Sequence, residues 1–286
     1  TLEYLGFHGE ALEKIHEATK LATGMILATG PTGSGKSTTL YTILDILNQP
    51  DVNISTIEDP VEYQMPRVNQ TQVRPDIGFT FATGLRSLVR QDPDIIMVGE
   101  IRDNETASLA VNAALTGHLV LSTLHTNSAA GAIPRLIDMK IEPFLLASTI
   151  SVVIGQRLVR RLADAKDRKA LTRAELTALG KVVDLERMLS LLRNEKVIGP
   201  AHGWDKVQFG APKAGEGDDG YKGRIGMHEV FKMSSAIKEL AIKNATSEVI
   251  EIQAKKEGMM TMLEDGIFKA AQGLTTIEEV LRVVSE

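Results

Sequence analysis

Short apolar runs and longer amphipathic stretches follow one another along the first half of the chain. The short runs predict buried strands near residues 25–28, 53–57, 95–98 and 119–124. In the stretches between them, apolar residues recur every three or four positions, which predicts helices over 9–22, from Lys36 onward and over 83–91. Strands that alternate with helices are typical of an α/β domain with a mostly parallel sheet. We therefore expect this class of fold.

Residues 128–162 are predicted to be mostly helical, because Pro134 and Pro143 stand where helices commonly begin. The next segment, 163–219, has a different character. Thr172 and Glu175 have the spacing of a capping box, which predicts a short helix, and a second helix is expected over 184–194. The Gly-rich, charged residues 211–220 are expected to be mobile. Segment 163–219 is therefore predicted to be a small inserted subdomain.

A strand pattern returns over 221–231, and four helices are expected after it. They are predicted near 235–244, 247–256, 260–272 and 276–284. The last begins with a capping box at Thr276 and Glu279, and Gly273 is expected to end the helix before it. The chain is thus predicted to have three parts: a core domain over 1–162, the inserted subdomain over 163–219, and a return strand with a C-terminal helical bundle over 220–286.

Composition limits the class of protein. The chain has 286 residues, of which 43% are hydrophobic and 24% charged, so a soluble globular protein with a substantial core is expected. The net charge of −5 argues against general attraction to nucleic acid or an anionic membrane. The sequence holds no cysteine, which excludes disulfides and thiolate zinc sites. No apolar run approaches a membrane span, and residues 1–20 lack a signal-peptide layout. Because the first residue is not Met, we expect the chain to be part of a longer protein.

The strongest motif follows the first predicted strand. Residues 24–41 read GMILATGPTGSGKSTTLY and contain the phosphate-loop pattern G-x-x-x-x-G-K-[ST]. Glycines let successive backbone N–H groups face one concavity, and the following helix N-terminus adds partial positive charge. The sequence therefore predicts a site for nucleotide phosphates and makes the core RecA-like in outline. Its expected binding residues are Gly30, Pro31, Thr32, Gly33, Ser34, Gly35, Lys36, Ser37 and Thr38, with Lys36 on the outer phosphates and the Ser37 hydroxyl on Mg²⁺.

Acidic residues and a histidine follow three other predicted strands. Glu58 and Glu62 come after the strand near 54, Glu100 after the strand near 95, and His125 after the strand near 120. The carboxyl ends of parallel strands meet at the edge of the sheet where ligands bind. His125 is open to two interpretations at this point, a functional contact or a structural histidine. His118 precedes its strand, so its position favours a structural role.

Arg86 and Arg90 are four residues apart and lie on one face of the helix predicted over 83–91. Two guanidinium groups side by side could bind an anion. From the spacing alone, a solvated helix face paired with nearby carboxylates is the favoured interpretation.

Nine stretches of the chain resemble the C-terminal ATPase domain of the type II secretion and type IV pilus assembly ATPases. The resemblance covers nearly all of the chain except about 163–219. The stretches are GPTGSGKSTTLY at 30–41, IEDPVEY at 57–63, FATGLRSLVRQDPDIIMVGEIRDNETA at 81–107, TGHLVLSTLHTN at 116–127, RLIDM at 135–139, EPFLLAS at 142–148, GQRLVRRL at 155–162, GYKGRIGMHEVF at 220–231 and EDGIFKAAQGLTTIEEVLRVV at 264–284.

The resemblance implies roles for individual residues. Residues 57–62 correspond to the family's Asp box, 98–102 to its Walker B segment and 116–125 to its His box. Glu58 would orient or deprotonate the attacking water, with Glu62 as the second candidate. Glu100 would act on Mg²⁺ and its water, and His125 would sense the γ-phosphate.

The same resemblance supports a functional role for three further residues. His118 belongs to the His box, which adds a nucleotide-site role to the structural one. Arg86 and Arg90 lie in a stretch that the family shares, which puts phosphate contacts between subunits on a par with the solvated-face interpretation.

The resemblance also implies a function. It predicts an ATPase motor, with ATP and Mg²⁺ as ligands, that works as a homo-hexamer and drives pilin or pseudopilin assembly through an inner-membrane platform protein. It would be cytoplasmic, at the inner face of the membrane, and attached there only through partners. The alternatives are a pilus retraction ATPase, a RecA-like nucleic-acid translocase, which the low aromatic content of 4% disfavours, and a nucleotide-binding module without turnover.

The chain departs from the family pattern in two respects. Assembly-type members commonly carry a four-cysteine zinc module after the stretch at 155–162, whereas the segment from Ala163 onward has no cysteine, so no zinc site is expected. The family's preceding domains are missing as well, and the domain next upstream supplies arginines to the nucleotide site. Because such arginines contribute about 10³ to 10⁵ to turnover in related enzymes, we expect the chain to bind ATP better than it hydrolyses it.

Overall fold

The computed structural model describes residues 1–164, 166–213 and 219–285. The chain folds as two compact units. Unit 1 contains residues 1–4, 10–156 and 229–259, and unit 2 contains residues 5–9, 157–228 and 260–286. The sequence analysis predicted three consecutive parts, and the two units have different boundaries. The reason is that two long strands, β6 (Ile150–Leu162) and β9 (Tyr221–Lys232), each run through both units.

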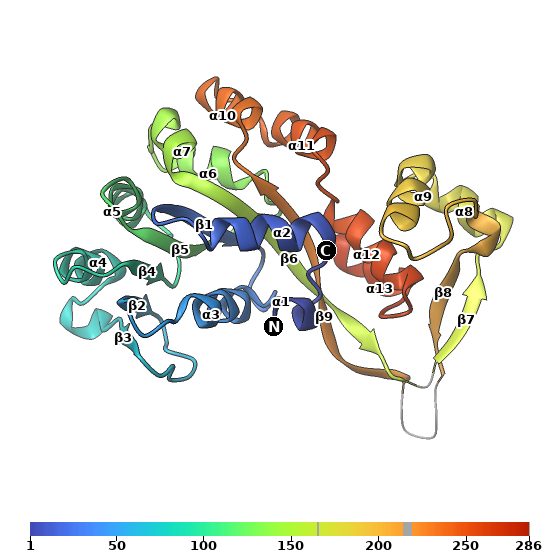
Figure 1. Cartoon of the computed structure of the whole chain (residues 1–286), viewed down its shortest axis with the longest axis horizontal. Helices are drawn as coiled ribbons and strands as arrows, with labels where there is room; N and C mark the ends of the chain where they lie inside the picture. Colours follow the sequence, from blue (N-terminus) through green and yellow to red (C-terminus); the bar gives the residue numbers. More distant parts are fainter. Residues whose placement is uncertain (165, 214–218, 286) are drawn as a thin grey trace. The chain divides into compact units, whose positions relative to one another are not determined.

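A seven-stranded, mostly parallel sheet carries unit 1, in the order β3-β2-β4-β5-β1-β6-β9 (Figure 1). Five neighbouring pairs, from β3 to β6, are parallel. The strands near 25, 54, 95 and 120 are confirmed as predicted. Besides β6 and β9, the strands are β1 (Gly24–Thr29), β2 (Ile54–Glu58), β3 (Val68–Gln72), β4 (Ile95–Val98) and β5 (Leu119–Leu124).

Helices cover both faces of this sheet (Figure 1). The β1–β2 crossover moves along the sheet in the direction opposite to the β3–β4 and β4–β5 crossovers. Because such crossovers are right-handed, the helix of the first lies on one face and the helices of the others lie on the second face. The helices are α1 (Leu2–Leu5), α2 (Gly9–Ala18), α3 (Lys36–Leu47), α4 (Phe81–Val89), α5 (Asn104–Leu115), α6 (Ala132–Asp138), α7 (Pro143–Thr149), α10 (Ser235–Ile242) and α11 (Ser247–Lys256).

A large apolar cluster of unit 1 lies between the sheet and the helices on its second face. Helices α4, α5, α7, α10 and α11 contact one another in that order. Their buried side chains form one cluster with Ile57, Val98 and Val120 of the strands. Burial of this size is what overcomes the conformational entropy of ordering the loops at the sheet edge.

The prediction that 128–162 is mostly helical is wrong for its last third. Residues 150–162 form β6, which pairs in parallel with β1 through partners such as Ile26 and Val152. Ile150, Val152, Val153 and Ile154 are buried, and β-branched residues of this kind favour a strand over a helix. A strand at this position extends the sheet beyond β1.

Strand β3 was missed as well. Its residues Val68–Gln72 are polar and only partly buried, because β3 lies at the edge of the sheet and pairs with β2 alone. Such a strand lacks the apolar run or alternation that predicts a strand. The helix expected over 9–22 is α2, which ends earlier, at Ala18.

Unit 2 contains the segment 163–219 as a second small sheet with two helices. Strands β7 (Lys166–Ala170) and β8 (Gln208–Pro212) pair antiparallel and were not predicted. The expected helices are confirmed as α8 (Arg173–Leu179), with its capping box at Thr172 and Glu175, and α9 (Leu185–Asn194). A 3-10 turn, η2 (Trp204–Lys206), precedes β8. Half of the stretch 211–220 that was predicted to be mobile, residues 214–218, lies outside the described part of the chain, and residues 211 and 212 belong to β8.

An apolar cluster holds this segment together. It contains Met188, Leu192 and Phe209, with Ile267 and Phe268 of α12 (Met262–Ala271). The single tryptophan, Trp204, packs against it. Within residues 1–164, 166–213 and 219–285, no group of three or more His, Cys, Asp or Glu is arranged to hold a metal ion. Besides this apolar cluster, the segment is held by polar contacts such as the ion pair of Arg187 with Glu264 at 2.8 Å.

Two buried carboxylates organise the rest of unit 2. Asp265 of α12 accepts hydrogen bonds from His8 at 2.7 Å and Lys269 at 2.5 Å. Glu279 of α13 (Ile277–Ser285) accepts a hydrogen bond from Arg160 at 2.6 Å, and Arg282 also donates to it at 3.0 Å.

No helix in the described part of the chain is long and apolar enough to cross a membrane.

Candidate functional site

Four loops meet at one edge of the sheet because of its register. Thr29 at the end of β1 lies beside Leu124 at the end of β5, and Val98 at the end of β4 lies beside Ser122 and Ile57. The residues that follow these strands are the phosphate loop, His125, Glu100 and, at the last position of β2, Glu58. The structure therefore brings together the principal residues predicted for the site, as expected for the carboxyl edge of a parallel sheet.

The phosphate loop has the open backbone that its glycines predicted. Gly30, Gly33 and Gly35 have φ angles of 146°, 77° and 89°, in the region that side chains disfavour. A Cβ at Gly33 would meet no atom within 4 Å, so this part of the loop is open. Helix α3 begins directly after Gly35 and has no side-chain cap. Its first N–H groups are therefore available to an anionic ligand.

Lys36 is folded back against this loop. Its Nζ donates to the carbonyl oxygens of Gly30 and Pro31, both at 2.8 Å, and the side chain is buried. Burial lowers the pKa of Lys36, and the nearby charge of Glu100 acts in the opposite direction. The ammonium group is thus held where a polyphosphate would replace backbone carbonyls as its partner.

The residues around the phosphate loop fit a nucleotide phosphate with Mg²⁺. Two buried hydroxyl groups beside the loop, Thr29 Oγ1 and Ser34 Oγ, have no hydrogen-bond partner among the described residues. Buried hydroxyls are normally satisfied, so these two are available to a bound ligand. Ser37 and Thr38 are exposed at the start of α3. The hydroxyl of Ser37 and the carboxylate of Glu100 are hard oxygen ligands of the type that Mg²⁺ prefers.

Glu58 is held in one orientation by three donors. The Thr56 hydroxyl donates to Oε1 at 2.5 Å, the Gln70 amide donates to the same oxygen at 3.2 Å, and the Tyr41 hydroxyl donates to Oε2. The carboxylate is only 4% exposed. Burial raises the pKa of Tyr41, and its hydrogen bond to Glu58 raises it further. A carboxylate fixed in this way is suited to accept a proton along one direction.

Glu100 lies next to Glu58 across a glycine. A Cβ on Gly99 would approach Glu58 Cα at 3.3 Å, so the two loops pack closely. Arg102 donates to Glu100 Oε1 at 2.5 Å, and His125 Nε2 lies 3.2 Å from Oε2. The hydrogen bond to Glu100 raises the pKa of Arg102. The carboxylate is thus bracketed by an arginine and by the predicted sensor histidine.

Glu62 lies near Glu58 but has a different setting. Its side chain is exposed, and its backbone N–H donates to the Tyr41 hydroxyl at 3.2 Å. Tyr41 therefore links the loop that carries Glu62 to the carboxylate of Glu58.

Three predicted residues are not brought to this edge within the chain. His118 precedes β5 beside Gly24, at the other end of β1 from the phosphate loop. It is buried, and its Nδ1 lies 2.9 Å from the carbonyl oxygen of Ala113. Arg86 and Arg90 are exposed on α4, and Arg86 forms an ion pair with Glu105. That pairing is the one expected of a solvated helix face.

Several site residues were missed in the sequence. Tyr41 and Gln70 orient Glu58, and Arg102 binds Glu100. Gln156 of β6 binds the phosphate loop. Arg102 and Tyr41 lie inside motifs that were identified, so their proximity could have been anticipated. Gln70 could not, because strand β3 was not predicted. Gln156 lies in the identified stretch 155–162, but that stretch was predicted to be helical, so its contact with the loop could not be anticipated either.

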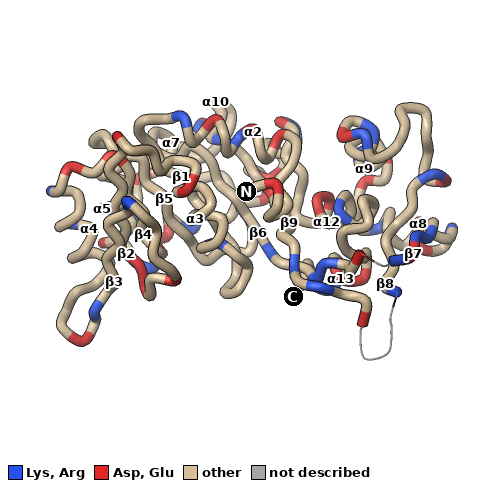
Figure 2. Tube along the Cα trace, turned by 60° about the horizontal axis from the view of Figure 1, so that its bottom comes forward, with Lys and Arg blue, Asp and Glu red and all other residues tan. Residues whose placement is uncertain are grey.

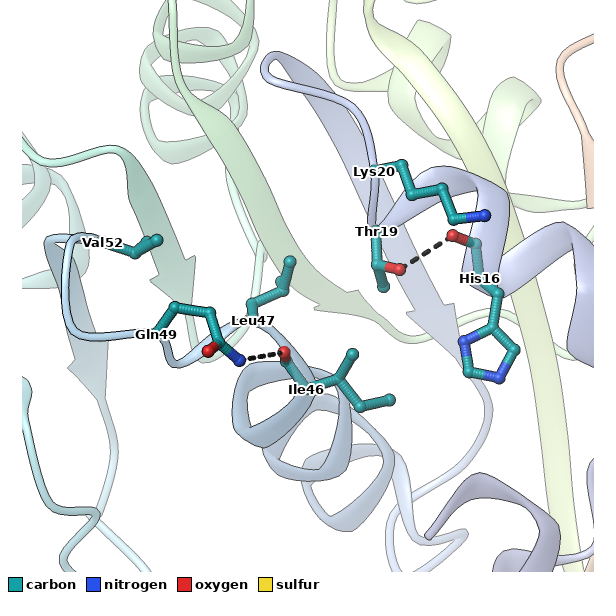
Figure 3. Close-up of a pocket in the computed structure, with 7 residues that line it drawn as sticks. All are labelled: His16, Thr19, Lys20, Ile46, Leu47, Gln49 and Val52. Atoms are coloured by element: carbon teal, nitrogen blue, oxygen red, sulfur yellow. Dashed lines mark hydrogen bonds between the residues drawn. The ribbon is translucent and has the colours of Figure 1, made fainter.

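A separate hollow of unit 1 lies at the far end of α3 (Figure 3). Ile46 and Leu47 at the end of α3 and Gln49 just after it line this hollow together with His16 of α2 and Lys20 just after α2. Because α3 begins at the phosphate loop and ends at Leu47, this hollow is not part of the nucleotide site.

Comparison with known proteins identifies the family. A family model described as "Type II/IV secretion system protein" matches residues 1–282. The chain belongs to this family. Among curated members, type II secretion system protein E of Xanthomonas campestris pv. campestris is 47% identical over 283 residues, which are 99% of this chain and 47% of that protein. The type IV pilus assembly ATPase PilB of Thermus thermophilus is 45% identical over 280 residues, 98% of this chain and 30% of that protein.

Two solved structures confirm the fold. The crystal structure of the pilus retraction motor PilT with bound ADP has a TM-score of 0.67 and 31% identity over 98% of this chain and 65% of that one. The ATPase DotB of Legionella pneumophila has the same TM-score at 23% identity, over 100% of this chain and 65% of that one, and shares the fold. This chain spans about half the length or less of the curated relatives named here.

Proposed function

We propose that this chain is the ATP-hydrolysing part of a motor that powers type II secretion or type IV pilus assembly. The family membership and the names of its relatives at 43–47% identity support this proposal. A retraction motor is the second candidate, supported by the 31% identity to PilT. The higher identity to secretion and assembly proteins favours the first.

The observation that carries the proposal is the meeting of the Lys36 cradle with Glu58, Glu100 and His125 at one sheet edge. A phosphate-binding loop alone needs no carboxylates, whereas hydrolysis needs groups that hold a metal and a water. The hydrogen bonds that orient Glu58 and bracket Glu100 give both carboxylates fixed positions, and catalysis of phosphoryl transfer depends chiefly on such positioning.

In this mechanism ATP binds with its phosphates on the loop 30–37, where the Lys36 ammonium exchanges its bonds to the Gly30 and Pro31 carbonyls for the outer phosphates. A bound Mg²⁺ would neutralise charge on the phosphate oxygens, held by Ser37 and Glu100. Glu58 accepts the proton of the attacking water or orients that water, with Glu62 as the alternative base. His125, within hydrogen-bond distance of Glu100, senses the γ-phosphate.

Further proposals concern the intact protein. We infer a homo-hexamer, because a head-to-tail interface that closes into a ring lets one subunit complete the site of the next. Arg86 and Arg90 are the candidates for contacts with a neighbour's phosphates, because both are exposed away from the loop of their own chain. His118 stays a candidate nucleotide-site residue through its place in the family's His box. The inferred partner is an inner-membrane platform protein, which would hold the motor at the cytoplasmic face of the membrane.

A RecA-like nucleic-acid translocase is less well supported. Basic and acidic residues are interspersed along the trace (Figure 2), and the net charge is −5. A nucleic-acid channel would need a basic groove with stacking aromatics. We therefore infer that nucleic acid is not a partner.

The test is Mg-ATP hydrolysis by this chain over a range of protein concentrations. We expect specific activity to rise with concentration and to fall at least about a hundredfold in Glu100→Gln. Glu17→Gln is the matched control, because Glu17 is an exposed glutamate of unit 1 paired with Lys232 at 3.0 Å. Turnover that Glu100→Gln leaves unchanged would refute the assigned site. Tight ATP binding without turnover at any concentration would instead leave two explanations, a need for the arginines of the family's upstream domain or a nucleotide-binding module without turnover. Hydrolysis by a chain that includes that domain separates the two.

A further inference from the structure

One buried side chain outside the phosphate loop bridges two points of it. Gln156 of β6 donates from Nε2 to the carbonyl oxygen of Ser34 at 2.8 Å, and its Oε1 accepts from the Thr39 hydroxyl at 2.8 Å. The side chain is 2% exposed. The amide has one satisfactory orientation, because the reverse one would place its oxygen against the Ser34 carbonyl.

The two partners of Gln156 flank the catalytically important lysine. Ser34 lies two residues before Lys36, and Thr39 lies three residues after it, in the first turn of α3. One amide therefore spans the junction between the loop and the helix. The N-cap of α3, Gly35, has no side chain to offer here, so the bridge of Gln156 adds to the contacts of Lys36 with the Gly30 and Pro31 carbonyls.

The backbone of Gln156 also borders the start of the loop. A Cβ on Gly30 would lie 2.4 Å from the Gln156 carbonyl oxygen, so loop and strand are in tight contact there. Gln156 thus touches the loop near its first glycine, before its lysine and at its helix. None of these contacts leaves the amide free for a nucleotide, which separates Gln156 from the binding residues themselves.

We propose that Gln156 is a positioning residue that keeps the phosphate loop in its nucleotide-binding shape. The inference rests on the proposed function. The Gln156 amide fixes the Ser34 carbonyl inward, so that the N–H groups on the other side of the loop face the phosphates. Without this bridge, a nucleotide must order the loop as it binds. The free-energy cost of this ordering weakens nucleotide affinity more than it slows the chemical step.

The first test is ATP and ADP affinity of Gln156→Met, which keeps the length of the side chain and removes both hydrogen bonds. We expect Kd for both nucleotides to rise about 10- to 100-fold, with a smaller change in kcat than in KM. The control is Asn48→Leu. Asn48 is 5% exposed and donates its amide to the Pro66 carbonyl at 2.8 Å, at the far end of α3 from the phosphate loop.

Thr39→Val is the second variant, since it removes one of the two bonds from the opposite partner while keeping the shape. We expect a rise in Kd of about threefold to tenfold, and no further rise when it is combined with Gln156→Met. Non-additive losses would show that both residues act through the same bridge. A loss of general stability alone would instead lower the melting temperature without a selective loss of nucleotide affinity.

The outcomes separate the two levels of inference. Wild-type chain that binds no nucleotide overturns the proposed function and this inference with it. If the wild-type chain binds ATP and the Kd of Gln156→Met lies within twofold of the wild-type Kd, the positioning role alone is overturned. Equal losses of affinity in Asn48→Leu and Gln156→Met, or additive losses for Thr39 and Gln156, overturn it as well. If Gln156→Met does not fold, the Kd of Thr39→Val decides, and a value within twofold of wild type refutes the role.

Discussion

Glu279 is expected to make the stability of unit 2 depend on acidity. Its carboxylate is 3% exposed and accepts hydrogen bonds from Arg160 and Arg282. Burial by itself would raise the pKa of Glu279, but the hydrogen bonds from the two guanidinium groups outweigh it and lower the pKa from 4.5 to about 2. A carboxylate with a lowered pKa stabilises the folded state above its unfolded pKa and loses this effect as the pH falls through its folded pKa. The window is therefore pH 4.5 to about 2.

The size of the effect follows from the same shift. Each pKa unit corresponds to about 1.4 kcal/mol, so the upper bound at neutral pH is about 3 kcal/mol. Arg160 and Arg282 are 46% and 51% exposed, and solvent screens their charges. We therefore expect Glu279→Gln to lower the free energy of unfolding by about 1 to 2 kcal/mol at pH 7. Near pH 2 the variant and the wild type should converge.

Urea unfolding between pH 2 and 7, followed by Trp204 fluorescence, measures this effect. Trp204 is the single tryptophan and packs in unit 2, so its signal reports the relevant part of the chain. Glu278→Gln is the control, because Glu278 is 70% exposed and only 3.7 Å from Lys169, a surface pair worth about 0.5 kcal/mol or less. A difference between Glu279→Gln and wild type that stays constant over the whole pH range would refute the electrostatic reasoning.

Two further predictions concern packing. Gly30→Ala should weaken ATP binding at least about tenfold, because its Cβ would lie 2.4 Å from the Gln156 carbonyl; Gly78→Ala, which also has positive φ but meets no atom within 4 Å, should leave ATP affinity unchanged in the same titration. Phe209→Ala should cost unit 2 about 3 to 5 kcal/mol by urea unfolding at the Trp204 signal, since Phe209 is buried in the apolar cluster of 163–219; a loss below about 1 kcal/mol would contradict the role given to that cluster.

Much of the core of unit 1 was predictable because its signals are local. The apolar strand before Gly30, the phosphate loop and the start of α3 at Lys36 follow from adjacent residues. The meeting of Glu58, Glu100 and His125 was predictable too, since parallel strands carry their carboxyl ends to one edge. Their roles stay predictions until they are measured.

The remaining features depend on distant partners. Strand β6 was mistaken for helix because Pro143 starts a real helix, α7, that ends at Thr149 directly before it. Without β6, nothing in the sequence connects Gln156 to Ser34, 122 residues away. Strand β3 is polar because only one of its edges is paired, so Gln70 gave no sign of its contact with Glu58. Tertiary pairing decided each case.

The interrupted chain path of unit 1 has a consequence during biosynthesis. A ribosome delivers residues 10–156, including the complete phosphate loop, before it makes the segment 229–259 that completes the same unit. That later segment supplies Phe231, Ile237 and Ile250 to the core. At about 5 to 20 residues per second, the delay is on the order of 5 to 20 s. During that interval the nascent nucleotide-binding half has an uncovered apolar face, which is the kind of surface that chaperones bind.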